Sequence, residues 1–110
     1  MSVRSVATFS VKPGHADAFE AAYREGQFLE RAVTNPGFIR GELIRPSGDT
    51  DHFIVVAEWA TEADYAAWQA NYDQLPAGPT TAMMATLTGP PTSSLGPVVI
   101  AADRSTEPPT

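Results

Sequence analysis

A change in hydrophobic period, from two to about 3.6 and back to two, is the feature that most constrains this fold. Apolar residues alternate with small polar ones over residues 3–11, which predicts a strand. From residue 15 to about residue 34 the apolar positions recur at steps of three and four, which predicts an amphipathic helix. Residues 38–45 and 53–59 return to a period of two. The turn residues between them predict an antiparallel hairpin.

The second half of the chain predicts the remaining elements. Thr61 and Asp64 have the spacing of a capping box, which predicts that a helix begins there. This helix is expected to carry Tyr65, Trp68, Gln69 and Tyr72 on one face. A short helix is expected over residues 80–87, a loop over 89–94 and a final strand over 95–102. The resulting order β-α-β-β-α-(α)-β predicts an α+β ferredoxin-like fold, the split β-α-β with a four-stranded antiparallel sheet and both main helices on one face.

The strand expected at residues 53–59 is apolar on one face and nearly so on the other. The helices of one chain cover only one face of such a sheet. A second copy of the chain is therefore expected to cover the other face, which predicts a homodimer.

Length and composition limit the number of domains, the kinds of partner and the metal chemistry expected of this chain. The chain has 110 residues, which predicts a single domain over residues 1–102, and the polar, Pro-containing segment 103–110 is expected to be a disordered tail. A net charge of −6 with seven Lys and Arg argues against nucleic acid and anionic membranes as partners. The absence of Cys excludes disulfides and thiolate metal sites, and the two His lie far apart, so no metal is expected. The chain shows neither a signal-peptide pattern nor a membrane-spanning run, so a cytoplasmic location is expected.

Two stretches carry a resemblance to a known family. Asn35-Pro36-Gly37-Phe38 opens the second strand, and the segment 55–68 runs from a strand that ends in Trp through a capped turn into an aromatic helix. Together with the order of elements, they are similar to the antibiotic-biosynthesis monooxygenase family over residues 3–102. The resemblance implies a dimeric α+β barrel, in which two sheets face each other and each subunit has a pocket between sheet and helices.

The resemblance also implies site residues. In the family's anthrone oxygenases the strand-end Trp and a Tyr on the next helix line the pocket, and these correspond to Trp59 and Tyr65. Those enzymes carry an Asn four residues before that Trp, where this chain has Val55. The haem-degrading branch needs an axial His on or after the second helix, and no His follows His52 here.

Oxygenation without a metal or cofactor requires a substrate that gives an electron to dioxygen once it has lost a proton. The protein must bind a flat aromatic, favour its anion with hydrogen-bond donors, and exclude water. The expected donors are the Trp59 indole N–H and the Tyr65 hydroxyl, and the candidate proton acceptors are His52, Glu42 and Glu58. The candidate substrate-binding residues are Phe53, Trp68, Tyr72 and Met83.

Each candidate also has a structural interpretation. Aromatic residues on the inner side of a helix or strand serve as core packing, and Met fills gaps. His52 follows a hairpin turn, where a surface position is common.

The leading functional hypothesis is a cofactor-independent monooxygenase that uses dioxygen on a polycyclic aromatic, a polyketide-type phenol or anthrone. Three alternatives remain open at the level of sequence. They are a cyclase or isomerase on a similar skeleton, an oxygenase assisted by reduced flavin, and a dimeric protein that binds an aromatic ligand without converting it. Dependence on oxygen and on reduced flavin distinguishes them.

Overall fold

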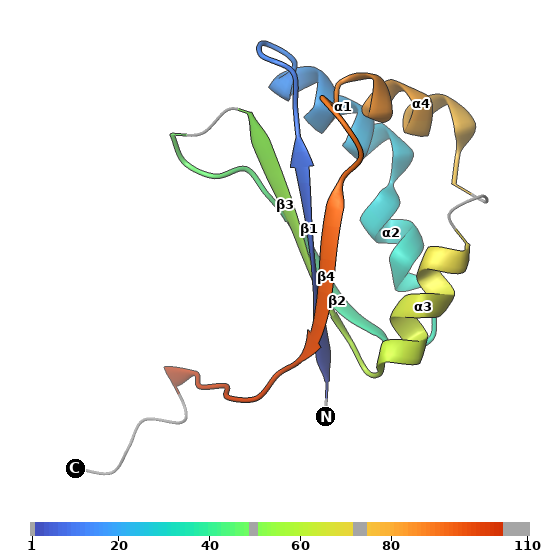
Figure 1. The fold of residues 1–110 in the computed structure, drawn as a ribbon. Coiled ribbons are helices and arrows are strands. Elements are labelled where there is room, and N and C mark those ends of the chain that lie inside the picture. The colour runs from blue at the N-terminus through green and yellow to red at the C-terminus, as the bar shows by residue number, and fades with distance from the viewer. Residues whose placement is uncertain (1, 49–50, 72–74, 105–110) are drawn as a thin grey trace.

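The computed structural model describes residues 2–48, 51–71 and 75–104. The elements in chain order are β1 (Val3–Ser10), α1 (Ala16–Gly26), α2 (Phe28–Val33), β2 (Phe38–Ile44), β3 (His52–Trp59), α3 (Glu62–Ala70), α4 (Ala77–Ala85) and β4 (Thr92–Pro97). The strands form one antiparallel sheet in the order β2-β3-β1-β4. Figure 1 shows all the helices on one side of this sheet, with the other side uncovered. The expected ferredoxin-like α+β fold is therefore confirmed. None of the described helices has the length and apolar character needed to cross a membrane.

The prediction of a single long helix over residues 15–34 is wrong, because the chain forms two helices that meet at Gln27. Gln27 has φ 52°, in the left-handed region, and this ends α1 and changes the direction of the chain before α2. A Cβ atom on Gly26 would lie 2.6 Å from the ring of Phe28. Gly26 thus lets the Phe28 ring pack against the end of α1, and the break directs α2 towards β2.

The final strand also differs from the prediction. It spans residues 92–97 instead of 95–102, and it begins within the segment expected to be a loop. Its pairing runs from Thr8 opposite Thr92 to Val3 opposite Pro97, and β1 has no residues left to pair with the chain beyond that point. The chain after Pro97 therefore leaves the sheet as an extended arm, visible in Figure 1.

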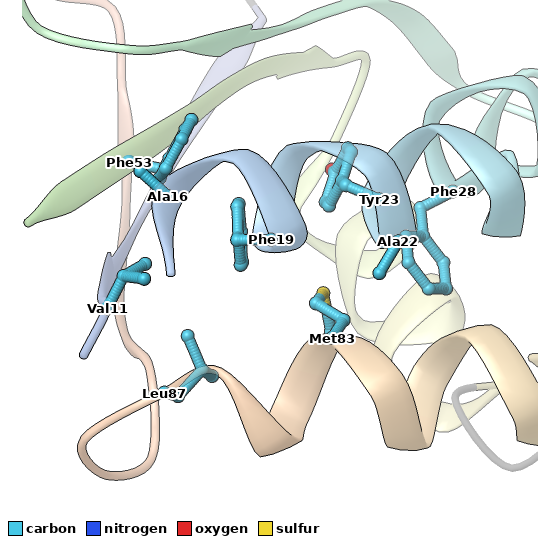
Figure 2. Packing of buried hydrophobic residues seen from close by; sticks show 9 residues of the cluster. All are labelled: Val11, Ala16, Phe19, Ala22, Tyr23, Phe28, Phe53, Met83 and Leu87. Atoms are coloured by element: carbon cyan, nitrogen blue, oxygen red, sulfur yellow. The ribbon is translucent and has the colours of Figure 1, made fainter. Parts of the chain in front are cut away.

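Two hydrophobic clusters fill the space between sheet and helices. In the first, Phe19 of α1 packs against Phe53 of β3 with ring centroids 4.5 Å apart. Figure 2 shows Phe19 and Met83 of α4 pointing toward one another, with Val11 and Leu87 closing one end. The second cluster lies at the other end of the sheet and consists of Val3, Ala32, Ala57, Trp59 and Tyr65.

The position of α3 is fixed by its N-terminal cap and by one glycine. The expected capping box is present: Thr61 Oγ1 accepts a hydrogen bond from Asp64 N at 3.2 Å, and Thr61 N donates to Asp64 Oδ2 at 3.1 Å. Gly37 has φ 87°, and its carbonyl accepts a 2.7 Å hydrogen bond from Ala60 N. A Cβ atom on Gly37 would overlap the Asp64 carboxyl group. Glycine at this position therefore lets the start of β2 lie directly against the start of α3.

Candidate functional site

A cavity of about 440 Å³ lies between the helices and the covered face of the sheet. Its floor is made of small residues on the central strands and on β4. Ser5 and Ala7 of β1, Ala57 of β3 and Ser93 of β4 all line it. The register places Ser5 opposite Ala57 and Ala7 opposite Ser93, so these small side chains are adjacent. Because they do not reach the helices above them, the core is hollow at this point.

The walls of the cavity are mostly aromatic. Trp59 stands at the end of β3 with only 1% of its surface exposed. Its ring centroid lies 5.6 Å from that of Tyr65 and 6.4 Å from that of Trp68, both on α3. The Phe38 ring packs edge-on against the Trp59 ring, with 5.0 Å between the ring centroids. Such a lining favours flat apolar ligands.

Two hydrogen-bonded pairs provide polar groups in this wall. Trp59 Nε1 donates to Ser5 Oγ at 3.1 Å, and Gln69 Nε2 donates to Tyr65 Oη at 3.0 Å. All four residues line the cavity. The expected role of the Trp59 indole N–H as a direct donor to substrate needs correction, because this proton is already directed at Ser5. The Tyr65 hydroxyl accepts in its pair and keeps its own proton to donate.

No described residue that lines the cavity carries a formal charge or an imidazole. The candidate proton acceptors His52, Glu42 and Glu58 are not among them. Glu58 instead forms an ion pair with Arg4 at 3.4 Å, and Glu42 forms one with Arg40 at 2.6 Å. The hydrogen bond that Arg40 donates to the Glu42 carboxylate raises the pKa of the Arg40 guanidinium above its usual range. The described part of the cavity therefore interacts with a ligand through hydroxyl and amide groups and through aromatic surface.

The structure brings together four of the predicted site residues around the cavity: Trp59, Tyr65, Trp68 and Met83. It does not bring Phe53 there, because this side chain is fully buried against Phe19 in the first cluster. His52 is also absent from the lining, since it sits at the start of β3, in line with Ile54 on the uncovered face. Tyr72 lies outside the described residues.

The sequence analysis missed Ser5 and Gln69. Ser5 is a polar residue at an inward position of the first strand, only 5% exposed, and that position in the alternating pattern is the signal that identifies it. Gln69 lies four residues after Tyr65 and so on the same side of α3.

A second, smaller cavity of about 290 Å³ is lined by charged side chains that pair with one another. Arg45 Nη1 lies 3.0 Å from Asp17 Oδ1 and 3.6 Å from Glu20 Oε1, and its guanidinium lies 5.7 Å from the centre of the Phe53 ring. Nowhere in the described ranges do three or more His, Cys, Asp or Glu gather in a way that would hold a metal ion.

Comparisons with known proteins agree with this geometry. The sequence model of the family Antibiotic biosynthesis monooxygenase matches residues 2–75. A search of curated proteins gave no match. The fold is similar to that of SnoaB, a cofactor-independent oxygenase from Streptomyces nogalater, in its crystallised variant (21% identity, TM-score 0.72, 91% of this chain and 95% of that chain).

Two further solved structures share the fold. Rv0793 from Mycobacterium tuberculosis has 14% identity and a TM-score of 0.72, over 94% of this chain and 100% of that chain. A protein from Nitrosomonas europaea, described as an antibiotic biosynthesis monooxygenase, has 20% identity and a TM-score of 0.73, over 91% of this chain and 100% of that chain. At these identities the neighbours show the fold, while the family match covers more than half of the chain. The chain therefore belongs to the antibiotic biosynthesis monooxygenase family.

Proposed function

We propose that this protein is a cofactor-independent monooxygenase that acts on a polycyclic aromatic phenol or anthrone of the polyketide type. The observation that carries the proposal is the aromatic cavity whose described polar groups are hydroxyls, an amide and an indole, with no charged side chain. Its volume of about 440 Å³ falls in the range of sites that enclose small organic ligands, about 300–1,000 Å³. The solved relative SnoaB, described as a cofactor-independent oxygenase, supports the same reaction class.

The chemistry of such a cavity depends on the substrate. An anthrone ionises at its CH₂ carbon, and the anion gives one electron to dioxygen. The resulting radical and superoxide combine, and a proton converts the peroxide to a hydroperoxide, which loses water. The balance is one CH₂ group and one O₂ giving one C=O group and one H₂O. The protein's tasks are to bind the ring system, stabilise the anion and exclude bulk water.

Four of the described residues have proposed roles in these tasks. Trp59 and Trp68 contact the faces or edges of the aromatic rings, since both line the cavity and lie close together. The Tyr65 hydroxyl donates a hydrogen bond to the oxygen on which the negative charge of the anion is concentrated. Met83 shapes the helix side of the cavity. A proposed contact of Tyr72 with substrate concerns a residue outside the described ranges.

We also propose that two copies associate through the uncovered face of the sheet. Val6 and Val56 are directly paired there, and Val6 and Ile44 are 38% and 40% exposed. Val6, Ile44, Ile54 and Val56 form an apolar patch on this face, bordered by the charged residues Arg4, Glu42 and Glu58. An apolar patch with a polar rim is a contact surface of the kind that protein partners cover. Isologous pairing of two copies would cover it on both chains at once.

Oxygen uptake by the purified, metal-stripped protein with anthrone tests the proposed reaction. We expect uptake well above the uncatalysed rate, with product mass showing one added oxygen atom and the loss of two hydrogens. Tyr65→Phe should lower kcat about tenfold or more, because it removes one donor to the anion. The matched variant His52→Gln should keep wild-type activity, because His52 does not line the cavity.

Other results would favour the alternatives. Conversion of the substrate without oxygen would indicate a cyclase or isomerase. Activity only with added reduced flavin would indicate a flavin-assisted oxygenase. Tight binding of anthrone with no acceleration under any of these conditions would contradict the proposal and indicate a binding protein.

A further inference from the structure

Two hydroxyl groups in the cavity wall, the buried one of Ser5 and the partly buried one of Tyr65, accept hydrogen bonds, and no described group of the chain accepts their own protons. Ser5 Oγ accepts from Trp59 Nε1, and Tyr65 Oη accepts from Gln69 Nε2. Indole and amide nitrogens only donate, so the direction of both bonds is fixed by chemistry. Within the described ranges of the chain, neither hydroxyl has a further hydrogen-bond partner.

Both hydroxyl groups belong to residues that line the cavity and contact Trp59. The Trp59 ring contacts Ser5 through its nitrogen and the Tyr65 ring edge-on, at 5.6 Å between ring centroids. Ser5 is 5% exposed, and a buried hydroxyl proton without an acceptor is unfavourable, so a ligand oxygen atom that reaches this proton is favoured.

Acceptance of a hydrogen bond also makes a hydroxyl group a stronger donor. Each N–H group polarises the O–H bond of its partner, and this cooperative effect is larger where water is excluded. The arrangement therefore favours a negatively charged oxygen on the ligand over a neutral one.

We propose that Ser5 contacts the substrate directly, and that its hydroxyl and that of Tyr65 together donate to one substrate oxygen that carries the negative charge of the anion. Trp59 and Gln69 are then positioning residues that act through Ser5 and Tyr65. This inference rests on the proposed function, which it deepens by naming the groups that stabilise the anion. It reassigns the indole N–H of Trp59 from substrate donor to the group that orients and polarises Ser5.

Binding of 2-hydroxyanthraquinone provides a test that is independent of turnover. The absorbance of this probe changes when its phenol ionises, so a pH titration reports the pKa of the bound phenol. Wild-type protein should shift that ionisation to lower pH than in free solution. Ser5→Ala should reverse at least half of the shift and lower kcat for anthrone oxidation about tenfold, with KM changed less than about threefold.

Ser94→Ala is the matched control. Ser94 is the neighbour of Ser93 on β4, is exposed and does not line the cavity. This substitution should leave both the probe ionisation and kcat near wild type. If Ser5→Ala behaves like Ser94→Ala, or if wild-type protein leaves the ionisation of the probe unchanged, the inference is overturned.

A double-mutant cycle separates action through Ser5 from a general packing effect. Ser5→Ala leaves the Trp59 N–H unpaired and can destabilise the protein, whereas Trp59→Phe with Ser5→Ala removes both partners. If Trp59 acts through Ser5, the double variant shifts the probe ionisation no more than Ser5→Ala alone. Additive effects of the two substitutions would overturn this part of the inference.

Gln69→Glu tests the second pair by reversing it, because a carboxylate accepts the Tyr65 proton that the amide leaves free. We expect Gln69→Glu to weaken the stabilisation of the bound anion more than Gln69→Leu does. The opposite order would overturn the role of Gln69.

The binding titration does not depend on catalysis, so it distinguishes this inference from the proposed function. A shifted ionisation of the probe without oxygen uptake would contradict the proposed function and still support the donor arrangement.

Discussion

The two faces of the sheet are built from the same strands and differ in the size of their side chains. On the covered face the centre is small, with Ser5 opposite Ala57, and a cavity lies above it. On the uncovered face Val6 is opposite Val56 and Ile44 is opposite Ile54, with Glu42 beside Val56. Neighbouring residues of one strand thus face the proposed ligand site on one side and the proposed contact surface on the other.

The comparison shows that a pocket can arise where the central strands carry small side chains instead of large ones. Large aromatic residues surround the cavity but do not fill it, because the floor beneath them is made of Ser and Ala. The uncovered face has the branched side chains of Val6 and Val56 at the neighbouring positions. Substitutions one residue apart should therefore separate ligand binding from subunit contact.

The largest effect is expected from filling the floor. Ala7→Leu places a branched side chain in the cavity, and we expect kcat/KM for anthrone to fall at least a hundredfold, about 2.7 kcal/mol. The adjacent substitution Val6→Leu, on the uncovered face, should leave kcat/KM within about twofold. Oxygen uptake at several substrate concentrations measures both. Similar losses in the two variants would contradict the assignment of the cavity as the site.

The next effect is expected on the uncovered face. The double substitution Val6→Asp and Val56→Asp places two charges at the proposed contact surface, and we expect the dimer dissociation constant to rise about 30- to 100-fold. Light scattering across a dilution series measures the change. Ala21→Asp on the exposed side of α1 is the control and should have no effect. A double variant that associates as strongly as wild type would remove the uncovered face from the interface.

A medium effect is expected at Gly37, which joins the sheet to α3 on the covered side. Gly37→Ala combines an unfavourable positive φ with an overlap on Asp64, and we expect a loss of roughly 2 kcal/mol or more in the free energy of unfolding. Gly14→Ala is matched for backbone, since Gly14 has φ 79° and no atom within 4 Å of the added Cβ. Gly14→Ala should lower the free energy of unfolding by about 1 kcal/mol. Urea unfolding measures both, and equal losses would show that the overlap has no energetic effect.

The sequence predicted the fold because its periodicity and turns are local signals. The capping box at Thr61 and the alternation in β3 are readable from residue spacing alone. The break at Gln27 was not readable, because it depends on a ring from Phe28 packing over Gly26. The end of β4 was not readable either, since it is set by the length of its partner β1.

The same distinction holds for the candidate site. Trp59 and Tyr65 were identified through the family resemblance, and the structure places both on the cavity. Ser5 was not predicted as a site residue, because its proposed role depends on a contact with Trp59, 54 residues away in sequence. Phe53 has the same alternation as Trp59, but its side chain packs against Phe19 and borders only the smaller cavity beside Arg45.

The smallest effect is expected from an ion pair on the uncovered face. Arg4 and Glu58 are cross-strand neighbours 3.4 Å apart, with side chains 43% and 18% exposed. Glu58→Gln should lower the free energy of unfolding by less than about 1 kcal/mol at concentrations where the protein is monomeric, because water and salt screen the pair. At concentrations that favour the dimer the loss should be larger, since the covered pair is less hydrated. Glu20→Gln, at the pair with Arg24 on α1, is the control, and its effect should not depend on protein concentration because α1 lies on the covered side of the sheet. Urea unfolding at two protein concentrations measures this, and a loss that is independent of concentration would mean that this part of the face stays in water when two copies associate.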